Sequence, residues 1–174
     1  MLFWRGQHLA RELAFAAERQ QADEALRESE QRYRTIIERS SDLIWTLDRE
    51  GRFVFVNRRA EELAGYGIED GHGRSFQPLV VEEDLPRVGE VFRRALAGEP
   101  QQYEVRVRRR DGSVLTLSVN TAPLHASNAV VGTVSFGRDV TDQKRAEAQL
   151  RESEEKYRAV FEESKDVIFI STPA

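Results

Sequence analysis

A stretch of this sequence occurs twice, and the repeat limits the possible folds more than any other feature. Residues 26–46 and 150–170 are identical at 11 of 21 positions when they are aligned at an offset of 124 residues. Similarity at that level indicates a repeated structural unit rather than chance. One unit therefore begins near Leu26 and a second begins near Leu150. Since the sequence ends at Ala174, we expect a piece of a tandem array that holds one unit and roughly the first strand of the next.

Each copy opens with a segment that is predicted to be helical. Residues 7–40 are rich in Ala, Glu, Arg, Gln and Leu and contain neither proline nor glycine. Apolar residues recur at spacings of seven and four, which is typical of the seam along which two helices of a coiled coil pack. The remaining positions of this seam are polar. We therefore expect a coiled coil of two chains that is only marginally stable. The alternative is a single amphipathic helix that lies on its own domain. The expected seam residues are Leu26, Tyr33, Ile37, Leu150, Tyr157 and Phe161.

Between the two helical segments, alternating apolar residues predict five strands. The first two are separated by a short turn that ends in Gly51, which favours an antiparallel hairpin. Asp111-Gly112 separates the third strand from the fourth and predicts a two-residue hairpin turn. The expected strands span residues 43–47, 53–56, 103–108, 115–120 and 130–136.

Two shorter helices are expected between the second and third strands. Asn57 is a preferred N-cap residue for a helix that continues to about Ala64, and Gly65 suits its C-terminal end. Asp84 is expected to cap a longer helix at residues 85–97. The order of elements predicts an α+β domain, a five-stranded antiparallel sheet with its helices on one face, flanked by N- and C-terminal helices of coiled-coil type.

The passage from the last strand to the second long helix takes about three residues, within residues 137–145. Thr141 is a good N-cap type, because its hydroxyl can accept a hydrogen bond from a backbone N–H that is free at a helix start. Asp142 adds negative charge in the first turn, where the helix dipole favours it. A helix that continues directly from a strand can carry a change in the sheet to whatever follows.

These segments resemble those of a PAS domain in its bacterial S-box form, in the same order, from Leu26 to Arg145. The resemblance implies a PAS fold and a sensory module that detects a small ligand or a redox state. It implies that Asp139, Val140 and Thr141 couple the domain to a signalling helix. It also implies an output domain outside this chain, either the histidine kinase of a two-component system or a diguanylate cyclase. The seam pattern described above predicts a homodimer through the flanking helices. The matching segments are residues 41–44, 48–51, 56–60, 63–66, 73–75, 84–87, 110–113 and 138–142.

The resemblance divides the chain into four parts. Residues 1–25 are expected to form an N-terminal helix or linker, and residues 26–141 the PAS domain. Residues 142–163 are expected to form a connecting signalling helix. Residues 164–174 would then be the truncated start of a second PAS domain.

The sequence leaves the ligand of the PAS pocket unknown. It contains no cysteine, which excludes a covalent flavin adduct and thiol-linked chromophores. Haem is disfavoured, because the resemblance implies an axial histidine on the long helix and residues 85–97 have none; His72 and His125 are expected outside that helix. Noncovalent flavin or a small organic ligand stays open. The candidate pocket residues are Trp45, Phe55, Phe92 and Leu117, and each of them also suits plain core packing.

One loop departs from the family pattern. The family usually has an apolar pair before the position of Gly73, and Gly71-His72 stands there in this sequence. That loop borders the pocket in the family, so we expect it to be more open here.

Charge and motif content exclude several other classes of function. The formal net charge is −4, and the arginines at residues 106–110 are expected on the solvent face of a strand, so we expect no nucleic-acid binding. No apolar run approaches the roughly 20 residues of a membrane span. We expect a cytoplasmic domain, with a membrane anchor upstream in a longer parent protein left open.

No constellation of a nucleophile with an activating base, no phosphate-binding loop and no metal-ligand spacing appears in the sequence, so we expect no catalytic activity from this chain. Two other functions stay open beside the sensory one. The first is a ligand-free dimerisation and interaction scaffold in a signalling protein with several PAS domains. The second is an enzyme that uses bound flavin.

Overall fold

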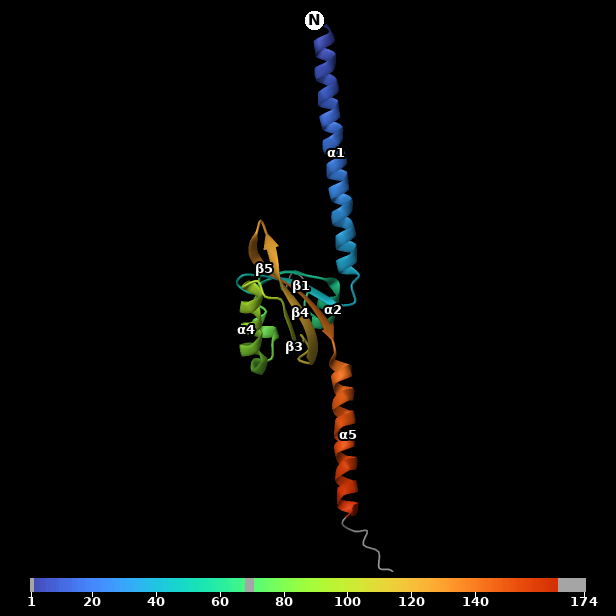
Figure 1. Ribbon diagram of the computed structural model, residues 1–174, viewed down its shortest axis with the longest axis vertical. Coiled ribbons are helices and arrows are strands. Elements are labelled where there is room, and N and C mark those ends of the chain that lie inside the picture. Colours follow the sequence, from blue (N-terminus) through green and yellow to red (C-terminus); the bar gives the residue numbers. More distant parts are fainter. Residues whose placement is uncertain (1, 68–70, 166–174) are drawn as a thin grey trace, which may run out of the picture.

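In a computed structural model, which describes residues 2–67 and 71–165, a sheet domain lies beside two long helices (Figure 1). Helix α1 (Leu2–Glu38) leads into the domain from one side, and α5 (Thr141–Lys165) leaves it on the opposite side. Five of the six predicted seam residues are exposed, and Ile37 is half-buried. Both helices extend away from the sheet, so the alternative of a helix lying along its own domain does not describe this structure.

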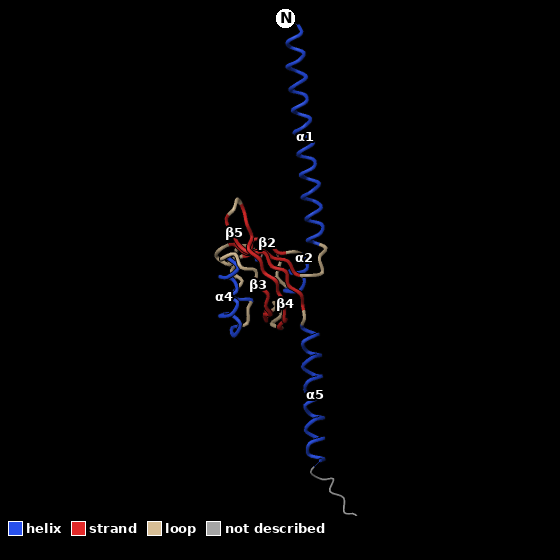
Figure 2. Tube along the Cα trace, in the orientation of Figure 1, coloured by secondary structure: helices blue, strands red, loops and turns tan. Residues whose placement is uncertain are grey.

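The sheet has five antiparallel strands, as predicted, in the order β2-β1-β5-β4-β3 (Figure 2). The first and last strands of the chain are therefore neighbours, and the start of β1 pairs with the end of β5. An ion pair from Arg138 Nε on β5 to Asp42 Oδ1 just before β1 (3.0 Å) joins the same ends of the two strands. The strands are β1 (Leu43–Asp48), β2 (Phe53–Val56), β3 (Gln101–Arg108), β4 (Val114–Ala126) and β5 (Ala129–Asp139).

The shorter helices pack on one face of the sheet, which confirms the predicted α+β architecture. Ala60 and Val88 are buried there against inward side chains of β1, β3 and β4, and this apolar burial is the main driving force for the fold. The elements on this face are α2 (Arg58–Ala64), the 3₁₀ turns η1 (Gln77–Leu79) and η2 (Glu82–Asp84), and α4 (Leu85–Leu96). The core residues from the strands are Leu43, Val105, Leu115, Leu117 and Val119.

Asn57 is fully buried and connects three elements. Its Oδ1 accepts a hydrogen bond from the backbone N–H of Ala60 (3.1 Å), which confirms the predicted cap of α2, and another from Ile44 of β1 (3.0 Å). Its Nδ2 donates to the backbone carbonyls of Ile37 (3.0 Å) and Asp42 (3.1 Å). One side chain thus joins the last turn of α1, strand β1 and helix α2, whereas the sequence pattern predicted only the cap.

Asp84 precedes α4 as predicted, but its side chain does not cap that helix. Its Oδ2 accepts hydrogen bonds from the backbone N–H (2.8 Å) and Nε (3.2 Å) of Arg106 on β3, and its Oδ1 accepts one from Nη2 (3.1 Å). Charge-assisted bonds of this kind are stronger than a neutral cap, which explains the different partner. The side-chain hydrogen bonds from Arg106 hold the pKa of Asp84 below its ordinary value, although burial opposes them.

We expect Asp84→Asn to lower the free energy of unfolding by about 2 kcal/mol at neutral pH, because a buried carboxylate that accepts three hydrogen bonds from the half-exposed Arg106 is lost. The pKa of Asp84 is lowered in the folded protein, so its contribution is fully present above the ordinary value of 3.8 and is lost as the pH falls through the folded value. Urea titrations should therefore show a difference between wild type and variant that shrinks below about pH 4.

The control for this experiment is Glu83→Gln. Glu83 lies 3.6 Å from Nη2 of Arg106 but its side chain is 70% exposed, so this change should alter stability by less than about 0.5 kcal/mol. A difference between wild type and Asp84→Asn that stays constant with pH would contradict the role of the Asp84 carboxylate.

The connection between β3 and β4 is longer than the predicted two-residue turn. Residues 109–113 join the two strands. A two-residue type I′ turn needs positive φ at both central positions, whereas only Gly112 of this loop has one (84°). Asp111 Oδ1 instead accepts hydrogen bonds from the backbone N–H (2.9 Å) and the hydroxyl (2.6 Å) of Ser113. These local bonds favour the longer loop.

Strands β1 and β5 approach each other closely at Gly132. A Cβ atom at this position would overlap with the backbone oxygen of Leu47 on β1. The pairing of β5 with β4 is also irregular here, because Gly132 pairs with Leu124 while Val130 pairs with His125. Such sites accept a residue without a side chain best.

Candidate ligand cavity and sheet-to-helix junction

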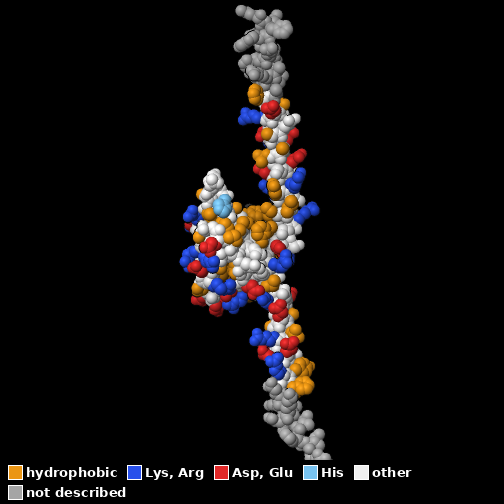
Figure 3. Space-filling view, viewed as in Figure 1, with side chains coloured by type: hydrophobic (Ala, Val, Ile, Leu, Met, Phe, Trp, Pro, Cys, Tyr) orange, Lys and Arg blue, Asp and Glu red, His pale blue; other side chains and the backbone are white. Residues whose placement is uncertain are grey.

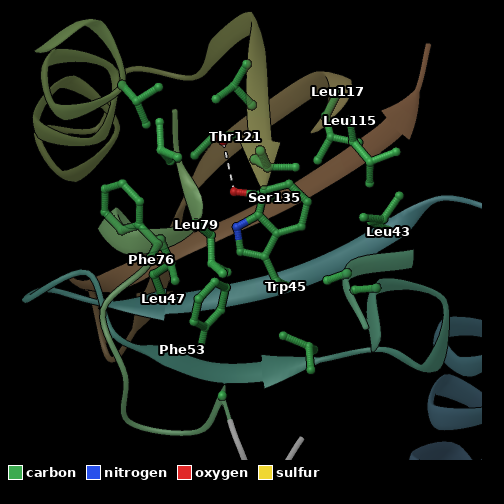
Figure 4. Close-up of a pocket in the computed structure, with 18 of the residues that line it drawn as sticks. Leu43, Trp45, Leu47, Phe53, Phe76, Leu79, Leu115, Leu117, Thr121 and Ser135 are labelled. Carbon is green, nitrogen blue, oxygen red and sulfur yellow. Dashed lines mark hydrogen bonds between the residues drawn. The ribbon is translucent and has the colours of Figure 1, made fainter. Parts of the chain in front are cut away.

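A cavity of about 130 Å³ lies between the sheet and the elements that cover it (Figure 4). All five strands contribute lining residues, together with α2, η1 and α4. In Figure 4 the side chains of Trp45, Phe53 and Leu79 point toward one another from β1, β2 and η1. The lining is predominantly apolar, as is typical of sites for small organic molecules.

Three of the four predicted pocket residues, Trp45, Phe92 and Leu117, line this cavity, but Phe55 does not. The reason is an irregularity in β2: Phe55 pairs with Thr46 and Phe53 pairs with Leu47, which leaves Val54 as an extra residue. The extra residue reverses the alternation of side chains along β2. Phe53 therefore faces the cavity, and Phe55 lies on the face of Thr46.

Sequence reasoning also missed the cavity residues of the segment before α4. Phe76 and Leu79 line the cavity, and the ring of Phe76 packs against that of Phe92 with centroids 5.5 Å apart. The segment around them has no helical or strand period, so periodicity could not place it. The pairing of Phe76 with the predicted Phe92 depends on tertiary structure alone.

A strip of polar side chains crosses the otherwise apolar lining. The hydroxyls of Thr121 on β4 and Ser135 on β5 hydrogen-bond to each other (2.9 Å). Burial raises the pKa of the Tyr103 phenol, while a hydrogen bond with Thr121 partly opposes this rise. Thr133 is fully buried, and its hydroxyl has no hydrogen-bond partner in the described part of the chain. The cavity therefore offers one uncommitted hydroxyl.

Charged groups are placed at less buried positions of the lining. Glu61 on α2 is half-buried and Arg108 at the end of β3 is exposed. Gly67 and Gly71 line the cavity. Residues 68–70 between them are outside the described residues, and the predicted opening of the loop at Gly71-His72 stays a prediction.

The two histidines considered as haem ligands are both exposed, and neither is among the residues that line the cavity. Nδ1 of His72 lies 3.1 Å from the backbone oxygen of Val54 on β2, and His125 lies near the end of β4. Over residues 2–67 and 71–165 no cluster of three His, Asp or Glu side chains suits a metal ion. No helix in the same ranges is long and apolar enough to cross a membrane.

The junction between β5 and α5 is held by the three residues that the resemblance singled out. Oδ1 of Asp139 accepts hydrogen bonds from the backbone N–H (2.9 Å) and the hydroxyl (2.5 Å) of Thr141. The Thr141 oxygen accepts a bond from the backbone N–H of Thr116 on β4 (2.9 Å), rather than from an amide of its own helix as predicted. The backbone N–H of Val140 donates to the carbonyl of Thr116 (2.9 Å).

The first turn of α5 is also tied to β3 and its following loop. Lys144 Nζ lies 2.8 Å from a carboxylate oxygen of Glu104 on β3, and this hydrogen bond raises the pKa of Lys144. Arg109 Nη2 lies 3.9 Å from Asp139 Oδ2. The first turn of α5 is therefore bonded to residues of β3, β4 and β5, namely Glu104, Thr116 and Asp139.

The fold and these two features define a class of protein, an α+β domain with a cavity between its sheet and helices and a long helix that follows its last strand. The family profile described as "PAS fold" matches residues 37–145. The chain therefore belongs to the PAS family, as its sequence pattern predicted, and a PAS domain is a sensory rather than a catalytic module.

Curated relatives are sensor proteins of signal transduction. The chain is 32% identical over 123 residues to the "Methanogenesis regulatory histidine kinase FilI" of Methanothrix harundinacea, covering 70% of this chain and 14% of that protein. It is 32% identical over 149 residues to the "C4-dicarboxylate transport sensor protein DctS" of Rhodobacter capsulatus, covering 80% of this chain and 22% of that protein. The chain thus spans under a quarter of either relative.

Solved PAS domains have the same architecture. The PAS domain of an HTR-like protein from Haloarcula marismortui superposes with a TM-score of 0.59 at 25% identity, covering 69% of this chain and 98% of that one. A PAS domain from Colwellia psychrerythraea gives a TM-score of 0.60 at 24% identity, covering 65% and 97%. These likenesses confirm the predicted fold.

Proposed function

We propose that this PAS domain relays the state of its cavity through Asp139, Val140 and Thr141 into α5, and from there to an output domain elsewhere in a longer protein. The supporting observation is the position of Thr116. Its backbone N–H donates to the hydroxyl oxygen of Thr141, and its carbonyl accepts a hydrogen bond from the backbone N–H of Val140. Its neighbours Leu115 and Leu117 line the cavity.

The register of the sheet supports the same route from cavity to helix. Leu117 on β4 pairs with Asp139 on β5, so a side chain that lines the cavity lies directly opposite the residue that holds Thr141. Thr133 and Ser135 line the cavity from the strand that ends in Asp139. A ligand that displaces either strand would move the contacts on which α5 begins.

The proposed output is a change in how two chains pair along α1 and α5. The seam residues Leu26, Tyr33, Leu150 and Tyr157 are between 59% and 69% exposed in a single chain, and a second copy would cover them. Figure 3 shows further apolar side chains gathered where α1 meets the domain. Because half of the seam positions are polar, two pairing states would differ by little free energy, which is what a switch needs.

The histidine kinase and sensor relatives support a kinase output, with a diguanylate cyclase as the alternative. The chain itself then has no catalytic role. We further propose that the second copy of the repeat, from about residue 164, begins another PAS domain. Helix α5 runs to Lys165, and residues 166–174 are outside the described residues.

The alternative function is a dimerisation scaffold with an empty cavity. The exposed seam supports it as well as it supports the relay. The two functions differ in whether the β5–α5 junction has to respond to the cavity, so the junction is the place to test them.

We expect Asp139→Ala to uncouple α5 from the sheet without unfolding the domain. The change removes an acceptor for both the amide and the hydroxyl of Thr141, and bonds to a charged group contribute about 1.5–3 kcal/mol. Hydrogen exchange at residues 141–144 should therefore accelerate at least about tenfold, while amides of β4 and β5 keep their protection. In the parent protein, output should stop responding to input.

The matched control is Asp142→Ala, which removes a neighbouring carboxylate that is 97% exposed and pairs only at 3.6 Å with Arg145. It should leave the exchange of the junction within about threefold of wild type, since only a weak helix-dipole contribution is lost. Normal signalling by the Asp139→Ala parent protein would contradict the relay and favour the scaffold.

A further inference from the structure

Among the fully buried side-chain polar atoms of the cavity lining in the described residues, only the hydroxyl of Thr133 has no hydrogen-bond partner. Thr133 is a lining residue of the cavity and is 0% exposed, and its hydroxyl has no hydrogen bond in the described residues. The neighbouring hydroxyls of Thr121 and Ser135 already bond to each other. A buried hydroxyl without a partner destabilises a protein, so its retention points to a partner that the protein chain does not supply.

The cavity sets the size of that partner. Its volume is about 130 Å³, slightly less than the engineered cavity of about 150 Å³ that holds one benzene molecule in another protein. A molecule of about six to eight non-hydrogen atoms therefore fits. The three fused rings of a flavin and the macrocycle of haem are larger than this space.

The surroundings of Thr133 set the charge of the partner. The lining within the described residues holds no fully buried charged side chain, and Glu61 and Arg108 are less buried than the strip at Thr133. An ion placed beside Thr133 would lose its hydration without a counter-charge, which is far more costly than burying a neutral molecule. A carboxylate or an ammonium group is therefore a poor match.

From this geometry we infer that the cavity binds a small uncharged organic molecule with a compact apolar body and a single hydroxyl or carbonyl oxygen, which hydrogen-bonds to Thr133. Phenols, cyclic ketones and short branched alcohols have this chemistry. Thr133 is then the residue that selects an oxygen-bearing ligand over a hydrocarbon of the same shape. This inference names the input of the sensory function proposed above.

The test compares phenol with benzene by isothermal titration calorimetry on the whole 174-residue chain and on Thr133→Val. The substitution replaces the hydroxyl by a methyl group of nearly the same size. In the variant, the phenol oxygen would be buried without its partner, so the preference for phenol over benzene should fall at least about tenfold. Thr46→Val changes a threonine on the opposite face of the sheet and should leave the preference unchanged.

Folding of the variant is controlled by urea denaturation without ligand. Because the Thr133 hydroxyl has no partner in the chain, Thr133→Val should be at least as stable as wild type. An equal preference for phenol in wild type and Thr133→Val would overturn the role of Thr133. Binding of neither probe at millimolar concentration, or tighter binding of benzoate or benzylammonium than of phenol, would overturn the ligand class.

The ligand class and the relay fail separately in these experiments. Phenol binding is measured without any signalling readout. If phenol binds as expected and hydrogen exchange at residues 141–144 does not change, the ligand inference stands and the relay is contradicted. If phenol does not bind but Asp139→Ala uncouples the parent protein, the relay stands with a different input.

Discussion

Replacing Asn57 by Ala should lower the free energy of unfolding by about 4 kcal/mol, a large share of the 5–15 kcal/mol that is usual for a domain. The substitution leaves the backbone N–H of Ile44 and the carbonyl of Asp42 buried without their side-chain partner, at about 1–3 kcal/mol each. Loss of the cap on α2 adds about 1 kcal/mol. Urea denaturation followed by circular dichroism measures the change.

The control for Asn57 is Arg58→Ala, one residue further along the chain. The Arg58 side chain is 76% exposed and makes an (i, i+4) ion pair with Glu62 at 2.8 Å, so its loss should cost less than about 0.5 kcal/mol. Asn57→Asp keeps an acceptor for Ile44 and Ala60 but loses both donors to the carbonyls of Ile37 and Asp42, and should fall below wild type as well. A loss under about 1 kcal/mol for Asn57→Ala would contradict the network.

Asn57→Ala should also loosen α1 from the domain. Only Asn57 among buried side chains donates to the last turn of α1 in the described structure, through the carbonyl of Ile37. Hydrogen exchange in residues 34–40 should accelerate under conditions where the sheet is still folded. This second measurement separates a local loss at α1 from a general loss of stability.

Replacing Gly132 by Ala should destabilise the protein by about 3 kcal/mol or more. The added methyl group overlaps with backbone rather than with a flexible side chain, since its nearest neighbour is the carbonyl oxygen of Leu47. Relief requires β1 and β5 to move apart, and these strands pair over six residues from Leu43 to Asp48. Thermal and urea denaturation of the whole chain measure the effect.

The matched control is Gly89→Ala, a glycine-to-alanine change of opposite expected sign. Gly89 lies within α4, and a Cβ atom there would have nothing within 4 Å. Alanine in a helix interior is more favourable than glycine by about 0.5–1 kcal/mol, so this variant should be more stable than wild type. If both substitutions changed stability alike, the close approach at Gly132 would not be the cause.

The elements of this fold were predictable because their signals are local. The alternation of apolar residues, the cap at Asn57 and the glycine at residue 65 each act within one turn or strand, and the structure has those elements where they were expected. The prediction of a two-residue turn at Asp111-Gly112 was wrong, because hydrogen bonds from Ser113 to the Asp111 side chain stabilise a longer loop.

The candidate site was predictable only in part, because its composition depends on contacts between distant residues. Because of one extra residue in β2, Phe53 and Val56 line the cavity while Phe55 does not, and nothing in the local pattern shows it. Asp84 is a residue type that often caps helices, but its side chain bonds instead to Arg106, which lies 22 residues away in the sequence. The solitary hydroxyl of Thr133 is recognisable only once every neighbouring group has been placed.

The length of α5 has a consequence for the spacing of domains in a tandem array of this unit. At 25 residues and about 1.5 Å of rise per residue, the connector is about 38 Å long. If a second PAS domain follows α5, as proposed above, a straight connector of this length would hold the two sheets apart along its axis. In that arrangement, one domain would signal to the next by rotation or translation of the connecting helix. Whole domains could then be added or removed without a new interface between neighbouring domains.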